Sequence, residues 1–351
     1  MVTTDSLGFL DAVATLPEQL GDAHDAAAAI ATDRLPNADG VQNIVVLGMG
    51  GSGIAGDVLA AAANAVLPVP VTVLKQIRTP RFVGPSTLAF AVSYSGDTEE
   101  TLSMTQGALE AGARLVAIST GGALGRLAAS AGALHIACPE GLMPRAALGA
   151  LVAPMFVTLF RLGLVPDARS WLVAAREQLA RRRDECAPSV MGRANPAREL
   201  ARRIDGTIPV IYGGGALGGV AAMRWKADVN ENAKAPAFWN AYPELDHNEI
   251  CGWGQHGDVT RQVLSLVELR HGYEAEQLGR RFDITRTIIE EAVHQVLEVR
   301  AAGEGRLAQL LDLMYVGDWV SCYLALQSEV DPGPIDAIAQ LKEALAAGRS
   351  D

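Results

Sequence analysis

The sequence predicts an α/β protein made of two doubly wound parallel sheets with additional helices. Short apolar runs rich in β-branched residues alternate with stretches of helical periodicity, which is typical of parallel sheets covered by helices. The turn at 48–53 is rich in glycine and follows one of these runs. The same pattern of apolar strand, glycine turn and small-residue helix recurs at 209–228, which indicates two related halves.

Composition narrows the class of protein. The chain has 351 residues, of which 49% are apolar and 20% charged, as in a globular protein long enough for two domains. The net charge is −11 and no basic run occurs, so nucleic acid is not an expected partner. The longest apolar run, 146–160, is shorter than a bilayer requires and contains Pro154, so no membrane partner is expected.

The cysteines indicate a reducing compartment. The chain has 4 cysteines and no C-x-x-C pair, so neither a zinc site nor a disulfide framework is expected. The first residues, M-V-T-T-D-S-L-G, do not have the basic start and apolar core of a signal peptide. We therefore expect a cytoplasmic protein.

The first half is expected to span 1–155. Leucine and valine recur at helical spacing within 4–35 and predict a helical pair. Asn43–Leu47 is an unbroken apolar run, as in a buried parallel strand. Further strands are expected at 69–74, 88–93, 114–119 and 133–137, and helices at 54–63, 98–111 and 122–130.

A helical connection, 156–205, is expected to lead to a second half at 206–351. This half begins with a strand at 209–212, a glycine loop at 213–215 and a helix at 216–228. Downstream we expect a strand at 263–269, a long helix at 274–302, a helix at 307–327 and a last helix that carries Lys342. An aromatic stripe at positions 315, 319 and 323 is typical of a core face.

The first glycine turn offers an anion site. Gly48–Gly53 matches G-x-G-x-x-G between a strand and a helix, the pattern of dinucleotide-binding proteins. Such proteins carry an acid at the end of the next strand, and here that strand ends V-L-K-Q-I-R. The missing acid disfavours a dinucleotide. The free backbone N–H groups of the loop, the hydroxyl of Ser52 and a helix N-terminus together suit one phosphate.

A second cluster of hydroxyls lies in S-Y-S-G-D-T, which begins at Ser93. Asp97 or Thr98 can act as the N-cap of the following helix, a structural role that leaves Ser93 and Ser95 unexplained. Three hydroxyls around a glycine between a strand and a helix can bind a phosphate without a lysine.

The stretch 230–253 concentrates ionisable and aromatic side chains. It reads N-E-N-A-K-A-P-A-F-W-N-A-Y-P-E-L-D-H-N-E-I-C-G-W. Such a mixture can desolvate ionisable groups and shift their pKa values, as acid–base catalysis requires. A helix end, a loop and a short helix with solvated charges is the structural alternative.

These motifs resemble those of a known family. The glycine and serine motifs look like the sugar isomerase (SIS) domain, a flavodoxin-like fold that binds phosphosugars. N-E-N-A-K with E-L-D-H-N-E, the pair Pro144-Arg145, and D-P-x-P followed by L-K resemble the bifunctional phosphoglucose/phosphomannose isomerases. The resemblance covers most of the chain from Asn43 to Lys342.

The resemblance implies a role for each site residue. Glu231 would be the base that moves a proton between C1 and C2, and His247 would open the sugar ring from the partner subunit of a homodimer. Arg145 would stabilise the enediolate, and Lys342 would contact the substrate near the ring oxygen. The phosphate would be held by the first-half loop residues Gly51, Ser52, Ser93, Ser95 and Thr98.

The chemistry of aldose–ketose isomerisation agrees with this set. It needs a carboxylate base, a group that moves the ring proton and a cation for the oxyanion, and it needs no metal and no cofactor. We therefore expect an isomerase that converts glucose 6-phosphate and/or mannose 6-phosphate to fructose 6-phosphate. The alternatives are a non-catalytic phosphosugar-binding protein or regulator, a dinucleotide oxidoreductase, and an SIS deaminase or epimerase.

Overall fold

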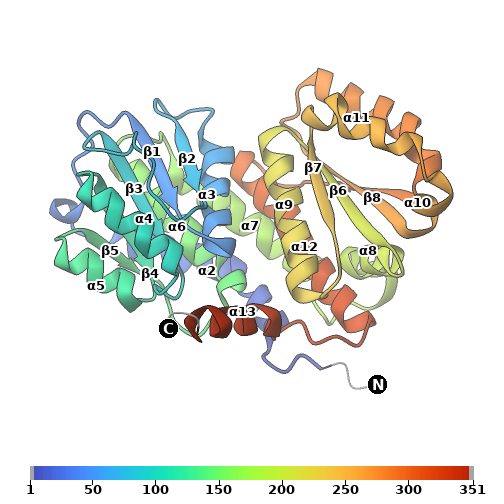
Figure 1. Cartoon of the computed structure of the whole chain (residues 1–351), viewed down its shortest axis with the longest axis horizontal. Coiled ribbons are helices and arrows are strands. Elements are labelled where there is room, and N and C mark those ends of the chain that lie inside the picture. The colour runs from blue at the N-terminus through green and yellow to red at the C-terminus, as the bar shows by residue number, and fades with distance from the viewer. Residues whose placement is uncertain (1–3, 348–351) are drawn as a thin grey trace.

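A computed structural model, which describes residues 4–347, contains two parallel sheets joined by a helical core (Figure 1). The first sheet has the strand order β2-β1-β3-β4-β5 and the second has the order β7-β6-β8-β9. All neighbouring strands run parallel. Both sheets begin with the order second-first-third, which is the flavodoxin-like winding. The predicted fold class is confirmed.

The first sheet follows the predicted strands closely. Its strands are β1 (Asn43–Leu47), β2 (Val71–Leu74), β3 (Thr87–Val92), β4 (Arg114–Ser119) and β5 (Leu134–Ala137). Its covering helices are α3 (Gly50–Ala63), α4 (Glu99–Glu110) and α5 (Gly122–Ser130). β1 and β3 are buried on both faces, which is why their sequences are continuous apolar runs rather than alternating ones.

The second sheet differs from expectation at both edges. Its strands are β6 (Ile208–Gly214), β7 (Phe238–Tyr242), β8 (Leu264–Arg270) and β9 (Gln295–Arg300). Its helices are α9 (Gly215–Asn232), α10 (Gly257–Val263) and α11 (Glu276–Ile289). The single helix predicted over 274–302 is wrong, because the chain leaves α11 and returns as β9. In β9, Leu297 and Val299 are buried and alternate with exposed residues, a strand period that the longer apolar pattern obscured.

Most of the remaining helices form a core shared by both halves. They are α1 (Phe9–Ala14), α2 (Leu16–Ala28), α6 (Leu148–Arg161), α7 (Ala168–Cys186), α8 (Pro196–Ile204) and α12 (Arg306–Gln327). The last helix, α13 (Asp336–Ala347), lies outside this core, and its described side chains are exposed. One contiguous apolar cluster includes residues from both halves. The expected aromatic stripe of α12, at Tyr315, Trp319 and Tyr323, is buried in this core. Within residues 4–347, no helix is long and apolar enough to cross a membrane.

The two halves meet through α3 and α9, which lie side by side in the middle of the molecule (Figure 1). α9 runs four residues beyond the helix predicted at 216–228 and ends at Asn232. This extension carries Glu231 on the last helical turn, next to the segment that follows β5.

Candidate active site at the junction of the two halves

The first glycine turn is shorter than predicted because the helix begins within it. α3 starts at Gly50, and its N-cap, Met49, provides no side-chain cap for the free N–H groups of the first turn. Gly50 has φ 51°, a conformation that favours glycine. A Cβ on Gly51 would lie 3.1 Å from the carbonyl oxygen of Pro144 and 3.4 Å from the Cα of Arg145. The turn is thus packed directly against the 3₁₀ helix η2 (Pro144–Ala146).

The hydroxyls predicted to form a phosphate cradle lie around this turn. The backbone N–H of Tyr94 donates to Ser52 Oγ over 3.2 Å, which ties the first motif to the second. Ser93 Oγ donates to Thr98 Oγ1 over 2.9 Å, and Ser95 Oγ accepts from the N–H of Asp97 over 3.3 Å. The structure therefore brings the hydroxyls of both motifs to the carboxyl ends of β1 and β3, where ligands bind in doubly wound sheets.

Asp97 and Thr98, the two candidates for the N-cap of α4, do not cap this helix with their side chains. Thr98 has the N-cap position, but its side chain makes no cap hydrogen bond and instead pairs with Ser93. The carboxylate of Asp97 accepts from the N–H of Ala123 over 2.8 Å and so caps α5. A Cβ on Gly96, which has φ 77°, would lie 2.1 Å from the carbonyl oxygen of Gly121, so only glycine fits this contact. The hydroxyls of Ser93 and Thr98 therefore stay together near Ser52, at the predicted phosphate site.

Arg145 is buried next to the cradle, with 4% of its surface exposed. Its Nε donates to Asn232 Oδ1 over 2.8 Å. Its Nη2 donates to the carbonyl oxygens of Pro332 and Gly333, each over 2.6 Å. The guanidinium carbon lies 4.3 Å from the centroid of the Phe9 ring, a cation–π contact. Burial lowers the pKa of Arg145, and the charges of Glu231 and Asp228 oppose that shift.

The end of α9 holds Glu231 beside Arg145. Glu231 is half-buried, and the ammonium of Lys234 donates to its carbonyl oxygen over 2.6 Å. Lys234 has φ 55° and also contacts the carbonyl oxygen of Pro332 at 3.3 Å, so it closes the C-terminus of the helix. Burial lowers the pKa of Lys234, and the charge of Arg145 adds to this shift.

A buried ionic cluster lies one helical turn before Glu231 on α9. Arg224 forms ion pairs with Asp228 at 2.8 Å and Asp318 at 3.0 Å. Its Nη2 also donates to the carbonyl oxygen of Arg145 over 2.6 Å. Burial raises the pKa of Asp228 well above its usual value, Arg224 opposes this shift, and the carboxyl of Asp318 adds to it. The cluster fixes α9, α12 and the Arg145 segment to one another.

His247 lies outside this group. It is exposed at the end of the 3₁₀ helix η4 (Glu244–His247), and among residues 4–347 its ring has no hydrogen bond to Glu231 or Arg145. Its neighbours are firmly held. Asp246 pairs with Arg281 at 2.9 Å and accepts from Thr285 Oγ1 at 2.9 Å.

Glu249, just after His247, accepts from the phenol of Tyr212 and from the amide of Asn240. The histidine is therefore presented outward from an anchored segment. Two aromatic residues of the stretch 230–253, Phe238 and Trp239, are exposed on β7.

Lys342 also lies apart from the group. It is exposed on α13, as are Ile338, Leu341 and Leu345 on the same helix. The segment that leads into α13 carries the carbonyl oxygens of Pro332 and Gly333 that accept from Arg145. The start of the Lys342 segment is therefore attached to the site, although the lysine side chain extends into solvent.

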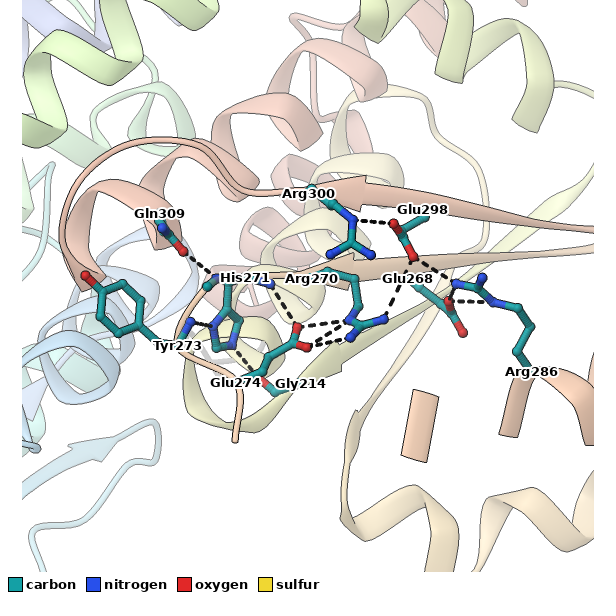
Figure 2. A network of polar contacts seen from close by, with 11 residues as sticks. Gly214, Glu268, Arg270, His271, Tyr273, Glu274, Arg286, Glu298, Arg300 and Gln309 are labelled. Carbon is teal, nitrogen blue, oxygen red and sulfur yellow. Dashed lines mark hydrogen bonds and ion pairs between the residues drawn. The ribbon is translucent and has the colours of Figure 1, made fainter. Parts of the chain in front are cut away.

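The second glycine loop is occupied by the protein's own side chains. A Cβ on Gly214 would lie 2.9 Å from Leu278, 3.0 Å from Phe282 and 3.4 Å from Glu274 Oε1. Figure 2 shows His271 bound to the carbonyl oxygen of Gly214 at 2.9 Å, with Glu274 close by. Burial lowers the pKa of His271.

Glu274 forms an ion pair with Arg270 at 2.8 Å. Arg270 also pairs with Glu298. Arg286 in turn pairs with both Glu298 and Glu268 (Figure 2). These side chains fill and brace the second loop.

The next feature is the arrangement of possible metal ligands in the described part of the chain. Residues 4–347 contain no group of three or more His, Cys, Asp or Glu side chains arranged to hold a metal ion. Cys138, Cys186 and Cys322 are buried, and Cys251 is exposed beside the His247 segment. Burial raises the pKa of the Cys138 thiol to about 12, which makes it unreactive at neutral pH.

Several contacts of the site have no signal in a single sequence. Asn232 belongs to the N-E-N-A-K motif, but the motif does not indicate that its amide contacts Arg145. Arg224, Asp228 and Asp318 look like surface charges on helices, and only their spacing of four residues from Arg224 to Asp228 suggests a pair. Their burial comes from the packing of α9 on α12, which the sequence does not reveal.

Comparison with known proteins identifies related chains. Residues 193–345 match a family model described as the bacterial phospho-glucose isomerase C-terminal SIS domain. A bifunctional phosphoglucose/phosphomannose isomerase of Caldicellulosiruptor bescii is 36% identical over 96% of this chain and 99% of its own length. The enzyme of the same name from Aquifex aeolicus is 33% identical over 87% of this chain and 90% of its own length.

Solved structures agree on the fold. A hypothetical protein from Thermus thermophilus superposes with a TM-score of 0.69 and covers 98% of this chain and 91% of its own. Its sequence identity is 19%, so the likeness concerns the fold alone.

Proposed function

The chain belongs to the bifunctional phosphoglucose/phosphomannose isomerase family, and on this premise we propose that it interconverts glucose 6-phosphate and/or mannose 6-phosphate with fructose 6-phosphate. The reaction passes through an enediol and moves protons only, so it requires no cofactor. We expect the protein to act in the cytoplasm, with a sugar phosphate as its small-molecule partner and no nucleic acid or membrane partner.

One observation carries this proposal: the cradle, a buried cation and a carboxylate meet at the junction of the halves. Gly51 packs against the backbone of Arg145, and Arg145 bonds to Asn232, the neighbour of Glu231. A sugar phosphate bound by its phosphate at the cradle would extend its other end toward this cation and carboxylate. Positioning of this kind supplies a large part of the rate enhancement in such reactions.

The proton steps follow from these groups. Once the ring is open, Glu231 removes the proton from C2 of the aldose and returns it to C1, which gives the ketose. Arg145 stabilises the negative charge that develops on the oxygens of the enediolate. Lys342 is assigned to contact the sugar near the ring oxygen, a role that rests on the family resemblance.

The phosphate is held in the first half. Gly51, Ser52, Ser93, Ser95 and Thr98 provide hydroxyls and backbone N–H groups at the uncapped start of α3. The second glycine loop is unsuited to an anion, since the carboxylate of Glu274 is next to it. A single phosphate site per chain is therefore proposed.

Ring opening is assigned to His247 of a second subunit in a homodimer. Its exposure on an anchored segment supports this role, because within residues 4–347 the ring makes no hydrogen bond to Glu231 or Arg145 of its own chain. α13 adds support, since Ile338, Leu341 and Leu345 are exposed on one helix and an apolar row of this kind is stabilised by a partner. Each active site of the dimer would then combine groups from both chains.

The alternative is a phosphosugar-binding protein or regulator without catalysis. Such a protein needs the cradle but has no use for a buried arginine beside a carboxylate, which is costly to maintain. The arrangement of Arg145 and Glu231 therefore favours the enzyme. A dinucleotide oxidoreductase is disfavoured by the missing acid after β2.

The direct test is an assay that starts from fructose 6-phosphate and measures glucose 6-phosphate and mannose 6-phosphate separately. We expect at least one product, formed without added metal or cofactor. Binding of fructose 6-phosphate without formation of either product would favour the non-catalytic alternative.

A further inference from the structure

Arg145 differs from the other buried arginines in the kind of partner that holds it. Arg224 pairs with Asp228 and Asp318, and Arg270 pairs with Glu274. Arg145 is as buried as these, yet among residues 4–347 it forms no ion pair with a carboxylate. Its hydrogen-bond acceptors are the Asn232 amide and two backbone carbonyls, and its face rests on Phe9.

Neutral hydrogen-bond acceptors orient the guanidinium of Arg145 without cancelling its positive charge. A carboxylate partner would orient the guanidinium and also cancel most of its field. An amide oxygen orients it through the same hydrogen bond and leaves the positive charge available. A cation that must stabilise a transient oxyanion requires both properties, a fixed position and an uncancelled charge.

The amide nitrogen of Asn232 is also held in place by a hydrogen bond. Its Nδ2 donates to Ser321 Oγ over 2.9 Å, and Ser321 Oγ donates to the carbonyl oxygen of Asp318 over 2.8 Å. Asn232 and Ser321 are 1% and 0% exposed. Because Nδ2 has an acceptor and Oδ1 has a donor, the network fixes which end of the amide faces Arg145. α12 in the core thus determines the position of the guanidinium.

We propose that Asn232 is a positioning residue for the isomerisation, which holds Arg145 against the site through a neutral hydrogen bond rather than through an ion pair with a carboxylate. This inference rests on the proposed function, because it assigns Arg145 to the enediolate. It predicts that an aspartate at position 232 impairs catalysis even though it preserves the size of the side chain and the oxygen that accepts from Arg145 Nε; the donor to Ser321 is lost. Outer groups that orient a catalytic group in this way typically affect activity by 10- to 100-fold.

The test compares Asn232→Asp, Asn232→Ala and Asn230→Ala. Asn230 flanks Glu231 on the other side, and its Nδ2 bonds to the carbonyl oxygen of Ala235 at 2.8 Å, away from Arg145. For both variants at position 232 we expect kcat to fall on the order of 10- to 100-fold with little change in KM for fructose 6-phosphate. Asn230→Ala should keep the wild-type kcat. The loss in Asn232→Asp should deepen as pH rises, because the introduced carboxyl ionises and pairs with Arg145.

A double-mutant cycle with Arg145→Lys separates positioning from general stability. If Asn232 acts through Arg145, Asn232→Asp should have little further effect on kcat in the Arg145→Lys background. Affinity for a sugar-acid phosphate, whose planar carboxylate resembles the enediolate, should fall in parallel with kcat. Asn232→Asp keeps the volume of the side chain, so the test remains available if Asn232→Ala does not fold.

The outcomes distinguish this inference from the proposed function. Near wild-type kcat in Asn232→Asp across the pH range, or fully additive effects with Arg145→Lys, would overturn the positioning role while the isomerase assignment stands. A wild-type protein that forms no aldose phosphate would instead overturn the proposed function itself.

Discussion

The phenol of Tyr212 donates a hydrogen bond to the carboxylate of Glu249, which follows His247 by two residues. Tyr212 is in the buried strand β6, so this contact ties the exposed His247 segment to the core of the second half. The Nε1–H of Trp253 donates to the same phenol over 3.2 Å. The position of His247 therefore depends on a residue far from it in sequence.

Tyr212→Phe removes this anchor and keeps the ring. A hydrogen bond to a charged group contributes about 1.5–3 kcal/mol, and we expect the free energy of unfolding to fall by about that amount. We expect kcat to fall on the order of tenfold or more, because His247 would lose its fixed geometry. Urea unfolding and steady-state kinetics provide the two measurements. Tyr273→Phe, at an exposed tyrosine, is the control, and equal kcat values for the two variants would contradict the anchoring role.

The phosphate cradle is expected in the first half only. A crystal soaked in sulfate or a sugar phosphate should hold the anion against Ser52, Ser93, Ser95 and Thr98. Ser93→Ala should raise KM by about three- to tenfold, the equivalent of one hydrogen bond, while Ser130→Ala at the exposed end of α5 should not. An anion seated at Gly213–Gly215 would show that the wrong loop has been assigned.

Shared active sites predict complementation between two inactive variants. Glu231→Gln lacks the base and His247→Ala lacks the ring-opening group, so each homodimer should be nearly inactive. After mixing, one site of every heterodimer contains both Glu231 and the partner's His247, and activity should return toward a quarter of the wild-type value if subunits exchange at random. Mass spectrometry of tagged chains measures the exchange. Full exchange without recovered activity would argue against a shared site.

The buried carboxyl of Asp228 predicts a pH dependence of stability. Because burial raises the pKa of Asp228 in the folded state, the native protein binds this proton more tightly than the unfolded chain does. The contribution to stability is present at low pH and is lost as pH rises through the native pKa. Asp228→Asn should therefore gain stability relative to wild type as pH rises.

Urea unfolding over a series of pH values checks this prediction, with the exposed Asp205→Asn as the control. Parallel curves for wild type and Asp228→Asn would mean that Asp228 is ionised throughout, with Arg224 outweighing the effect of burial.

The sequence predicted the sheets better than it predicted the site. β1 matches its predicted bounds, because a buried parallel strand is an unbroken apolar run. β9 was missed, because its alternation Q-V-L-E-V-R follows directly on a helical pattern and becomes a strand only through pairing with β8.

For the site, local motifs predicted a phosphate cradle, while long-range packing determined the surroundings of Arg145. Its acceptors lie at Asn232, Pro332 and Gly333, far along the chain, and nothing local to Pro144-Arg145 indicates them. The roles given to Glu231, His247 and Lys342 remain predictions from the family resemblance. The expected domain boundaries near 155 and 205 also remain predictions.

The central claim is that Glu231 transfers the proton between C2 and C1. The most direct measurement is NMR of the sugar phosphate in deuterated solvent, which follows deuterium entering at the exchanging carbon. Wild type should turn over fructose 6-phosphate with exchange or intramolecular transfer. Glu231→Gln keeps the size of the side chain and should still bind the substrate, with turnover reduced on the order of 10²–10⁴-fold and almost no exchange. Near wild-type turnover in Glu231→Gln would contradict the account and direct attention to Glu244 or Glu249.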